Sequence, residues 1–208
     1  MIKKKVKIKT EIKVRKRKNP YLQFQAENIL NELDPKNKID FKFIGEGSYG
    51  EVYCFELNQN KIFQNVILKP GKYIIKIFKR FTSTEEIKYL EKLSKYGLIP
   101  KIFIINKKFS IMKYIESETL LEFEENNRNN RNLMKKLFEN IISMLQKWHE
   151  LGYSHGDLDR RNILVSKNHK IYFIDPNFKN SEEEFESDNE LIKGYLEDYH
   201  YYNDQLKQ

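Results

Sequence analysis

The feature that most constrains this chain is a pair of short apolar runs bordered by carboxylate and amide residues. The first run, Ile163–Val165, comes shortly after Asp157 and directly after Asn162. The second, Ile171–Ile174, is followed at once by Asp175. Because a short polar turn separates the runs, we predict two strands joined as a hairpin. That hairpin would place Asn162 and Asp175 at neighbouring strand ends.

These three polar residues are the kinds of group that phosphoryl transfer with magnesium requires. One carboxylate accepts the proton of the attacking hydroxyl, while an amide and a second carboxylate hold the metal on the phosphates. Asp157, Asn162 and Asp175 supply them in that order. The spacing alone is only moderately specific, because Asp and Asn are also common turn residues. The upstream sequence therefore decides how much weight it carries.

A glycine-rich turn lies upstream between two runs of β-branched and aromatic residues. Gly45, Gly47 and Gly50 occupy its first, third and sixth positions. Glycines let the backbone approach phosphates closely, with amide groups as donors. No helix pattern follows the turn, which argues against a dinucleotide-binding βαβ unit. A plain glycine-rich hairpin is the alternative interpretation.

A lysine interrupts the apolar run of the next predicted strand, 73–78. An ammonium group in such a run is costly unless it has an anionic partner. The following segment predicts an amphipathic helix with a Ser/Thr-rich start. Glu86 shares the apolar face of that helix, so we expect it to pair with Lys76. Glu85 and Glu91 are the alternative partners.

Apolar periodicity predicts the remaining elements of an α+β fold. Strands at 102–105 and 109–112 would complete a five-stranded sheet, and a long amphipathic helix is expected from residue 133. A helix at 20–33, opened by a proline, is expected to pack on the sheet domain. The Asn-rich, charged stretch 122–132 is predicted to be a solvated loop.

Composition indicates a soluble globular protein. The chain has 208 residues, of which 33% are charged and 39% hydrophobic, enough for one or two small domains with a core. It contains no apolar run of membrane-spanning length and no signal-peptide pattern, so we expect a cytoplasmic protein. Export or delivery into a host cell without a readable signal stays open. Cys54 is the only cysteine, which fits a reducing compartment, and we expect it to be buried in a strand.

The net charge of +8 belongs to one segment. Residues 1–18 hold ten Lys or Arg and one Glu, and the rest of the chain is nearly neutral. An argument for nucleic-acid binding can therefore only be local. The alternation of apolar and basic residues predicts an edge strand protected by lysines. Alternatively, Arg15–Lys18 could bind an anionic partner such as a membrane, a nucleic acid or an import receptor.

Over residues 41–188 the chain resembles the protein-kinase-like superfamily. The motifs that carry the resemblance are, in order, GEGSYGEV, IIKIF, EEIKYLEKL, IMKYI, HGDLDRRNILV and IDP. The resemblance implies a bilobal α+β fold: an N-lobe at about 36–114 with a five-stranded antiparallel sheet and one main helix, and a reduced helical C-lobe at about 115–208. The chain would then consist of a basic segment, 1–18, and a minimal kinase domain, 19–208.

The resemblance also implies roles for individual residues, with ATP and Mg²⁺ as cofactors and a protein as the acceptor. Asp157 would be the catalytic base, and Lys76 and Glu86 the activating ion pair. Asn162 and Asp175 would bind the metal. The residues that would contact the nucleotide are Gly45, Gly47, Ser48, Tyr49, Gly50, Val52, Lys76, Met112, Lys113 and Ile115.

Several residues depart from the usual kinase pattern. Gly156 stands where regulated kinases carry Arg, so activation-loop phosphorylation is not expected as a switch. Asp159 stands where serine/threonine kinases carry Lys. Arg160 or Arg161 could instead supply positive charge to the transferring phosphate, and we expect Arg161 to be the catalytic one. Alternatively, either arginine could only form a salt bridge within the loop. Residues 175–177 read Asp-Pro-Asn in place of Asp-Phe-Gly, and proline disfavours a swinging regulatory movement.

The His-Gly-Asp and Ile-Asp-Pro forms resemble RIO-like and other atypical small kinases, aminoglycoside-type phosphotransferases, and minimal kinases of bacterial effectors or large DNA viruses. Within the resemblance to the protein-kinase-like superfamily, Asp188 matches the aspartate that opens a buried helix and steadies the catalytic loop. The resemblance implies an ATP- and magnesium-dependent serine/threonine kinase without activation-loop control. A small-molecule phosphotransferase and a non-catalytic nucleotide-binding module are the alternatives. Tyrosine as acceptor stays open, because Arg161 stands where tyrosine kinases often carry Arg.

Overall fold

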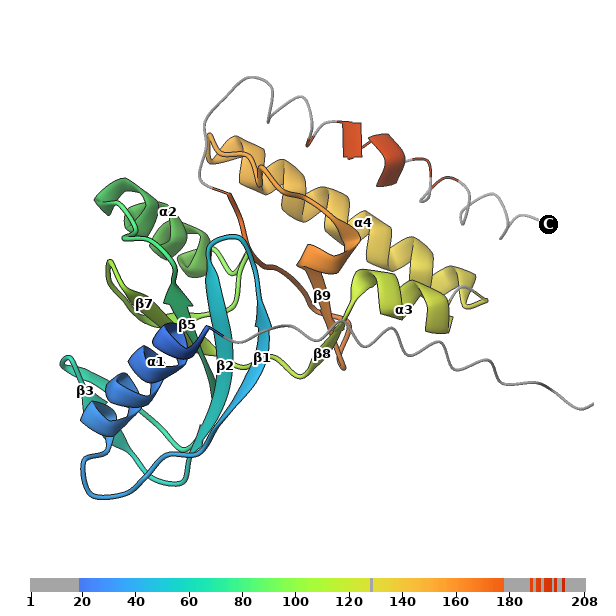
Figure 1. Ribbon diagram of the computed structural model, residues 1–208. Coiled ribbons are helices and arrows are strands. Elements are labelled where there is room, and N and C mark those ends of the chain that lie inside the picture. The colour runs from blue at the N-terminus through green and yellow to red at the C-terminus, as the bar shows by residue number, and fades with distance from the viewer. Residues whose placement is uncertain are drawn as a thin grey trace, which may run out of the picture.

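The computed structural model describes residues 19–127 and 129–177, together with residues 188, 190, 191, 193–195, 197 and 200. The predicted basic strand in 1–18 lies outside the described residues. Figure 1 shows two lobes, a sheet-rich one that carries the early strands and a helical one built around α3 and α4. In chain order the elements are α1 (Pro20–Leu33), β1 (Phe41–Glu46), β2 (Gly50–Leu57), β3 (Lys61–Phe63), β4 (Val66–Leu68), β5 (Gly71–Phe78), α2 (Thr84–Lys95), β6 (Ile102–Ile105), β7 (Phe109–Lys113), β8 (Ser117–Thr119), α3 (Leu120–Asn127), α4 (Arg131–Glu150), the 3-10 turn η1 (Arg160–Asn162), β9 (Ile163–Ser166) and β10 (Ile171–Phe173).

The first lobe contains the predicted five-stranded antiparallel sheet, in the order β1-β2-β5-β7-β6. Strand β5 shows that the two faces of this sheet differ in burial. Tyr73, Ile75 and Ile77 are buried, and the residues between them, Ile74 and Lys76, are only half-buried. Side chains alternate between the faces of a strand. One face of the sheet therefore faces a core, and the other faces the space between the lobes.

Helix α1 covers the core face of this sheet, as the sequence predicts (Figure 1). Asn19 caps it by accepting a hydrogen bond from the N–H of Tyr21, and Pro20 occupies the first turn, where its missing N–H costs nothing. Leu22, Ala26, Leu30 and Leu33 are buried with the inward residues of β2 and β5. The apolar stripe of α1 thus completes the core of the first lobe.

A short hairpin, β3 and β4, lies beside this sheet and was not predicted. Each strand has three residues, too few for alternation to register in the sequence. Its turn residues Gln64 and Asn65 both have positive φ, the backbone of a tight hairpin turn. Phe63 and Leu68 are buried in the first-lobe core. The hairpin therefore extends that core at one end.

The second lobe is organised around α4, which buries seven side chains ending with Trp148. The strands β8, β9 and β10 form a small antiparallel sheet whose buried residues join the same core. The pairing of β9 with β10 confirms the predicted hairpin. Helix α4 begins at Arg131, two residues earlier than predicted, after the Asn130 cap.

The stretch 122–132, predicted to be a solvated loop, contains most of helix α3, so that prediction was wrong. Thr119 and Glu122 form a reciprocal cap: the Glu122 carboxylate accepts from the Thr119 N–H at 2.9 Å, and the Thr119 hydroxyl accepts from the Glu122 N–H at 3.3 Å. This is a capping box, which pairs two helix-end N–H groups with side chains. Leu120 and Phe123 are buried on the second-lobe core. Local capping and burial thus outweigh the polar composition.

Helix α2 connects the two lobes. It follows β5 in the chain, yet its buried residues Tyr89 and Leu93 belong to the core of the second lobe. The Tyr89 ring lies 4.8 Å from that of Tyr153, and its hydroxyl donates to the Ser154 carbonyl at 3.0 Å. The position of α2 therefore follows the second lobe as well as the sheet.

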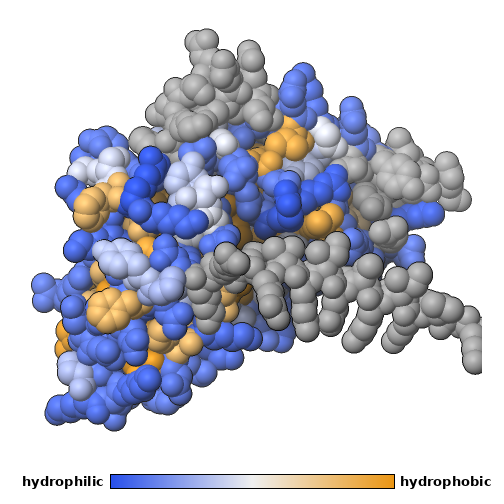
Figure 2. Space-filling view, viewed as in Figure 1, coloured by the Kyte–Doolittle hydropathy of each residue, from blue (hydrophilic) through white to orange (hydrophobic). Residues whose placement is uncertain are grey.

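The visible surface is largely hydrophilic (Figure 2). Among exposed apolar residues, Ile62 and Ile67 lie opposite each other on β3 and β4. Cys54 is half-buried in β2 rather than fully buried, and burial raises the pKa of its thiol above the ordinary value. Within the described part of the chain, none of the helices combines the length and the apolar character needed to cross a membrane.

Candidate functional site

A cavity of about 490 Å³ opens between the lobes. This volume is in the range of small-molecule sites in proteins. It brings together segments from both lobes, with the glycine loop and β5 on one side and β9 and β10 on the other. The predicted site residues that line it are Gly45, Tyr49, Val52, Lys76, Glu86, Met112, Lys113, Ile115 and Asp175.

The cavity has apolar walls that the sequence analysis did not assign. Ile44 and Ile74 line it from the first lobe, and Leu164 and Phe173 from the second. The strand alternation could have identified Ile74, because it lies two residues from Lys76 on the same face of β5. An apolar slot with a few polar groups at one end suits a flat heterocycle that carries an anionic group.

The glycine loop lies directly over the polar end of this cavity. A Cβ built on Gly50 would lie 2.3 Å from the carbonyl oxygen of Ile77, so only glycine fits there. A Cβ on Gly47 would lie 3.4 Å from the Asp175 carboxylate. The Lys79 ammonium donates to the Gly47 carbonyl at 2.9 Å. Ser48 is exposed at the tip of the loop.

Lys76 extends from β5 toward the second lobe, and its ammonium lies 2.5 Å from Oδ1 of Asp175. Asp175 follows β10 with a φ of 54°, a left-handed conformation that Asp adopts more readily than most residues. The turn brings its carboxylate to Lys76. Among the described residues Lys76 forms its ion pair with Asp175, and the predicted pair of Lys76 with Glu86 is not formed. Lys76 and Glu86 nevertheless line the same cavity.

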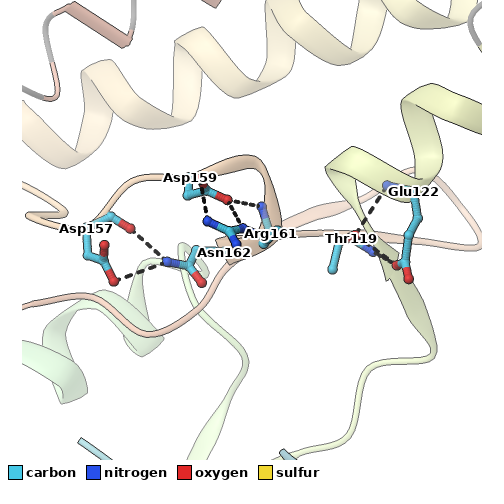
Figure 3. A network of polar contacts seen from close by, with 6 residues as sticks. All are labelled: Thr119, Glu122, Asp157, Asp159, Arg161 and Asn162. Carbon is cyan, nitrogen blue, oxygen red and sulfur yellow. Dashed lines mark hydrogen bonds and ion pairs between the residues drawn. The ribbon is translucent and has the colours of Figure 1, made fainter. Parts of the chain in front are cut away.

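Asp157 and Asn162 are joined within the loop that precedes β9 (Figure 3). The side-chain Nδ2 of Asn162 donates to the Asp157 carbonyl at 2.8 Å and to its carboxylate at 3.4 Å. The Ile174 N–H donates to the Asn162 carbonyl at 2.9 Å. Asn162 and Asp175 therefore meet at neighbouring strand ends, as the hairpin predicts.

The Asn162 and Asp175 side chains fit a magnesium ion. Mg²⁺ prefers oxygen ligands, and it is usually held by one or two carboxylates together with substrate phosphates. Because Nδ2 of Asn162 donates to Asp157, its amide oxygen remains available as a ligand atom. The described residues contain no cluster of three or more His, Cys, Asp or Glu that could cage a metal without substrate.

The two arginines of the loop form ion pairs away from the cavity. Arg161 donates through Nε to Asp159 at 2.7 Å, and this contact lowers the pKa of the Asp159 carboxyl (Figure 3). Arg160 donates through Nη1 to both carboxylate oxygens of Glu124 in α3, at 2.7 and 2.5 Å. These contacts agree with the alternative in which the two arginines only form salt bridges. Among the described residues no contact supports a catalytic role for Arg161, which stays a prediction.

His155 ties this loop to the rest of the second lobe. Its backbone N–H donates to the carboxylate of Asp188 at 2.6 Å, and its ring Nε2 faces the Ile174 carbonyl at 3.0 Å. Its own carbonyl accepts from the N–H of Asn177 at 2.8 Å. Both His155 and Asp188 are buried, and burial lowers the pKa of the imidazole. Asp188 therefore steadies the loop that carries Asp157, as its sequence match implies.

Comparison with known proteins agrees with this geometry. The family model of the RIO domain matches residues 56–202. The RIO-type serine/threonine-protein kinase Rio2 of Methanocaldococcus jannaschii is 31% identical over 96 residues, which cover 46% of this chain and 36% of that protein. The serine/threonine-protein kinase KIN4 of Saccharomyces cerevisiae is 28% identical over 169 residues, 72% of this chain and 20% of that protein.

A third relative has a different name. A probable bifunctional tRNA threonylcarbamoyladenosine biosynthesis protein of Methanosphaera stadtmanae is 39% identical over 94 residues, 44% of this chain and 17% of that protein. The chain thus spans well under half the length of each of these relatives. The RIO match covers more than half of the chain and includes β5, the loop that carries Asp157 and Asn162, and Asp175. The chain belongs to the RIO domain family of atypical protein-kinase-like proteins.

Proposed function

We propose that this chain is a minimal ATP- and magnesium-dependent protein kinase that transfers the γ-phosphoryl group to a Ser or Thr hydroxyl. The observation that carries the proposal is the contact of Lys76 with Asp175 in the lining of the interlobe cavity, together with the joined pair Asp157 and Asn162 in the loop before β9. The RIO family match and the serine/threonine kinases among the relatives support the same reaction class.

Each of these side chains has a physical task in such a reaction. Lys76 would hold the nucleotide phosphates, with N–H groups of the glycine loop above them. Asp157 would orient the acceptor hydroxyl and take its proton. Bound Mg²⁺, held by Asn162 and Asp175, would neutralise phosphate charge. Catalysis would then consist mainly of positioning and charge stabilisation, which a small scaffold can supply.

We also propose that activation-loop phosphorylation does not control this enzyme. Gly156, with a φ of 70°, occupies the position after His155, so a phosphate-sensing arginine is missing from the catalytic loop. The Asp188 carboxylate holds the loop instead through the N–H of His155. This contact is internal to the fold and requires no added phosphate.

The test is transfer of labelled γ-phosphate from ATP to protein acceptors in a cell lysate, with and without magnesium. Asp157→Asn should lower the transfer rate by about 10²- to 10⁴-fold, the range for loss of a general base, and should keep nucleotide binding. Asp175→Ala should abolish turnover with the fold intact. Asp40→Asn, at an exposed position before β1, is the matched control and should behave as wild type.

The outcomes separate the candidate functions. A labelled protein band that Asp157→Asn loses would support a protein kinase and provide its acceptor for identification. Substantial transfer by either active-site variant would contradict the assigned roles. Nucleotide binding without protein labelling would refute a protein kinase and favour a small-molecule phosphotransferase or a binding module.

For residues 1–18 we propose an anionic partner, because ten of these residues are Lys or Arg. Deletion of this segment should remove a salt-sensitive affinity and leave phosphoryl transfer to a generic acceptor unchanged. An affinity that is unchanged by the deletion would refute this role.

A further inference from the structure

The tip of the glycine loop makes a contact across the cavity that the proposed reaction does not require. The Tyr49 hydroxyl donates a hydrogen bond to Oδ1 of Asn177, which follows Asp175 and Pro176 in the chain. The two residues are 128 positions apart and belong to different lobes. Tyr49, Asp175 and Pro176 all line the cavity, so this contact lies at its edge.

Tyr49 is held at more than its hydroxyl. Its backbone carbonyl accepts from the N–H of Lys79 at 2.9 Å, and the Arg80 guanidinium lies 5.3 Å from the centre of its ring. Both partners follow directly after β5, the strand that carries Lys76. The aromatic ring is therefore oriented by the first lobe before its hydroxyl reaches the second.

Asn177 is held equally firmly from the other side. Its N–H donates to the carbonyl of His155, whose own N–H donates to the buried Asp188. Pro176 restricts the backbone immediately before it. Because of these restraints the Asn177 amide is a fixed acceptor on the second lobe. A closing movement would have to come from the glycine loop.

We infer that Tyr49 and Asn177 form a latch that holds the glycine loop closed over a bound nucleotide and slows nucleotide exchange. The inference rests on the proposed function. It gives Tyr49, which is already a predicted nucleotide contact, a positioning role, and it adds Asn177 to the site. It also accounts for Asn177 in the Asp-Pro-Asn segment, since a glycine at this position has no side chain to accept the bond.

The latch predicts a measurable kinetic effect. A hydrogen bond between neutral groups changes an equilibrium by about 2- to 10-fold when its free energy is converted at room temperature. Tyr49→Phe and Asn177→Ala should each raise the dissociation rate of a fluorescent magnesium-ADP analogue by about that factor. The double variant should be no faster than either single variant, because both remove the same contact. Both positions are half-buried, so the fold should tolerate the substitutions.

The experiment is stopped-flow displacement of the fluorescent ADP analogue by excess ATP, on the full chain. Tyr53→Phe is the matched control: it removes a tyrosine hydroxyl that bonds to Glu51 in β2, away from the cavity. It should lower the melting temperature and leave the dissociation rate unchanged. In steady state the latch variants should raise KM for ATP, with kcat unchanged or higher. Such a split between KM and kcat is not expected from a purely structural role.

Several results would overturn the latch. They are an unchanged dissociation rate in Tyr49→Phe, additive effects in the double variant, or an equal acceleration by Tyr53→Phe. Faster exchange in a protein that transfers no phosphate would support the latch and refute the proposed kinase activity. If the wild type transfers phosphate and the latch variants release the ADP analogue at the wild-type rate, the latch alone is refuted. Failure of the wild type to bind the nucleotide would refute both.

Discussion

His155 shows how one buried residue can link the loop that carries Asp157 to the stability of the whole protein. Its Nε2 faces the carbonyl of Ile174, and its Nδ1 has no hydrogen-bond partner within the described part of the chain. Protonation would place a second N–H in a buried position without an acceptor, which is costly. The nearby carboxylates of Asp188, Asp157 and Asp175 favour the charged form, but burial has the larger effect and lowers the pKa.

This lowered pKa predicts acid sensitivity. The ordinary value for histidine is 6.5, so as the pH falls below it the unfolded chain takes up a proton before the folded protein does. The contribution of the neutral His155 to the free energy of unfolding is therefore fully present above pH 6.5 and is lost as the pH falls below that value. Unfolding free energy, measured by urea denaturation between pH 7.5 and 5, should fall with a slope to which His155 adds at most about 1.4 kcal/mol per pH unit.

His155→Gln should make this slope shallower, although the variant will be less stable at pH 7. His169→Gln removes an imidazole from an exposed turn and is the matched control. If His155→Gln keeps the wild-type slope, the acid sensitivity of the fold arises from other groups and the argument from burial fails.

At the scale of elements, a buried carboxylate joins α1 to the strand that follows the glycine loop. Glu51, the second residue of β2, is fully buried. Its two oxygens accept from the N–H of Asn19, at 2.6 Å, and from the Tyr53 hydroxyl. The start of α1 is therefore attached next to Gly50.

Replacing Glu51 should loosen α1. Glu51→Ala leaves a backbone N–H and a buried hydroxyl without an acceptor, so the free energy of unfolding should fall by about 1–3 kcal/mol. Hydrogen exchange should increase most in the first turn of α1. Glu56→Ala, at an exposed position of the same strand, should leave both measurements within error of wild type. Equal effects of the two substitutions would show that the buried contact contributes little.

At the scale of the whole molecule, the two cores are not divided where the chain passes from one lobe to the other. Helix α2 follows the strands of the first lobe but buries Leu93 in the core of the second lobe. The first-lobe core contains α1, the inward residues of the sheet and the β3–β4 hairpin. The connection between the lobes is thus a packed helix as well as the segment after β7.

This arrangement predicts which part of the protein each core substitution destabilises. Leu93→Ala should cost about 2–5 kcal/mol through the cavity it leaves. It should increase hydrogen exchange in α4 and β10 more than in β1 and β2. Ile77→Ala, equally buried in the first-lobe core, should have the reverse pattern. Mass spectrometry of the exchanged peptides measures both. Matching exchange patterns in the two variants would contradict the assignment of α2 to the second core.

Most of the secondary structure could be predicted, because it depends on residue patterns that are local in the sequence. The five strands of the sheet, helix α1 and the β9–β10 hairpin follow from apolar periodicity and turn residues that lie close together in the chain. Most of the residues that were predicted to contact the nucleotide line one cavity. They could be predicted because glycine spacing and strand alternation determine which residues share a face. The capping residues Thr119 and Glu122 of helix α3 are also a local sequence feature, but the polar composition of the helix led to the prediction of a loop.

The sequence by itself thus determined the order of elements and the kinds of groups that meet between the lobes. Only the tertiary structure decided which of these groups pair. Lys76 contacts Asp175 rather than Glu86, and Tyr49 reaches Asn177. Asp175 lies 99 positions from Lys76 in the chain, and Asn177 lies 128 positions from Tyr49. Periodicity carries no information over such separations, because their geometry depends on how the two packed cores are placed against each other.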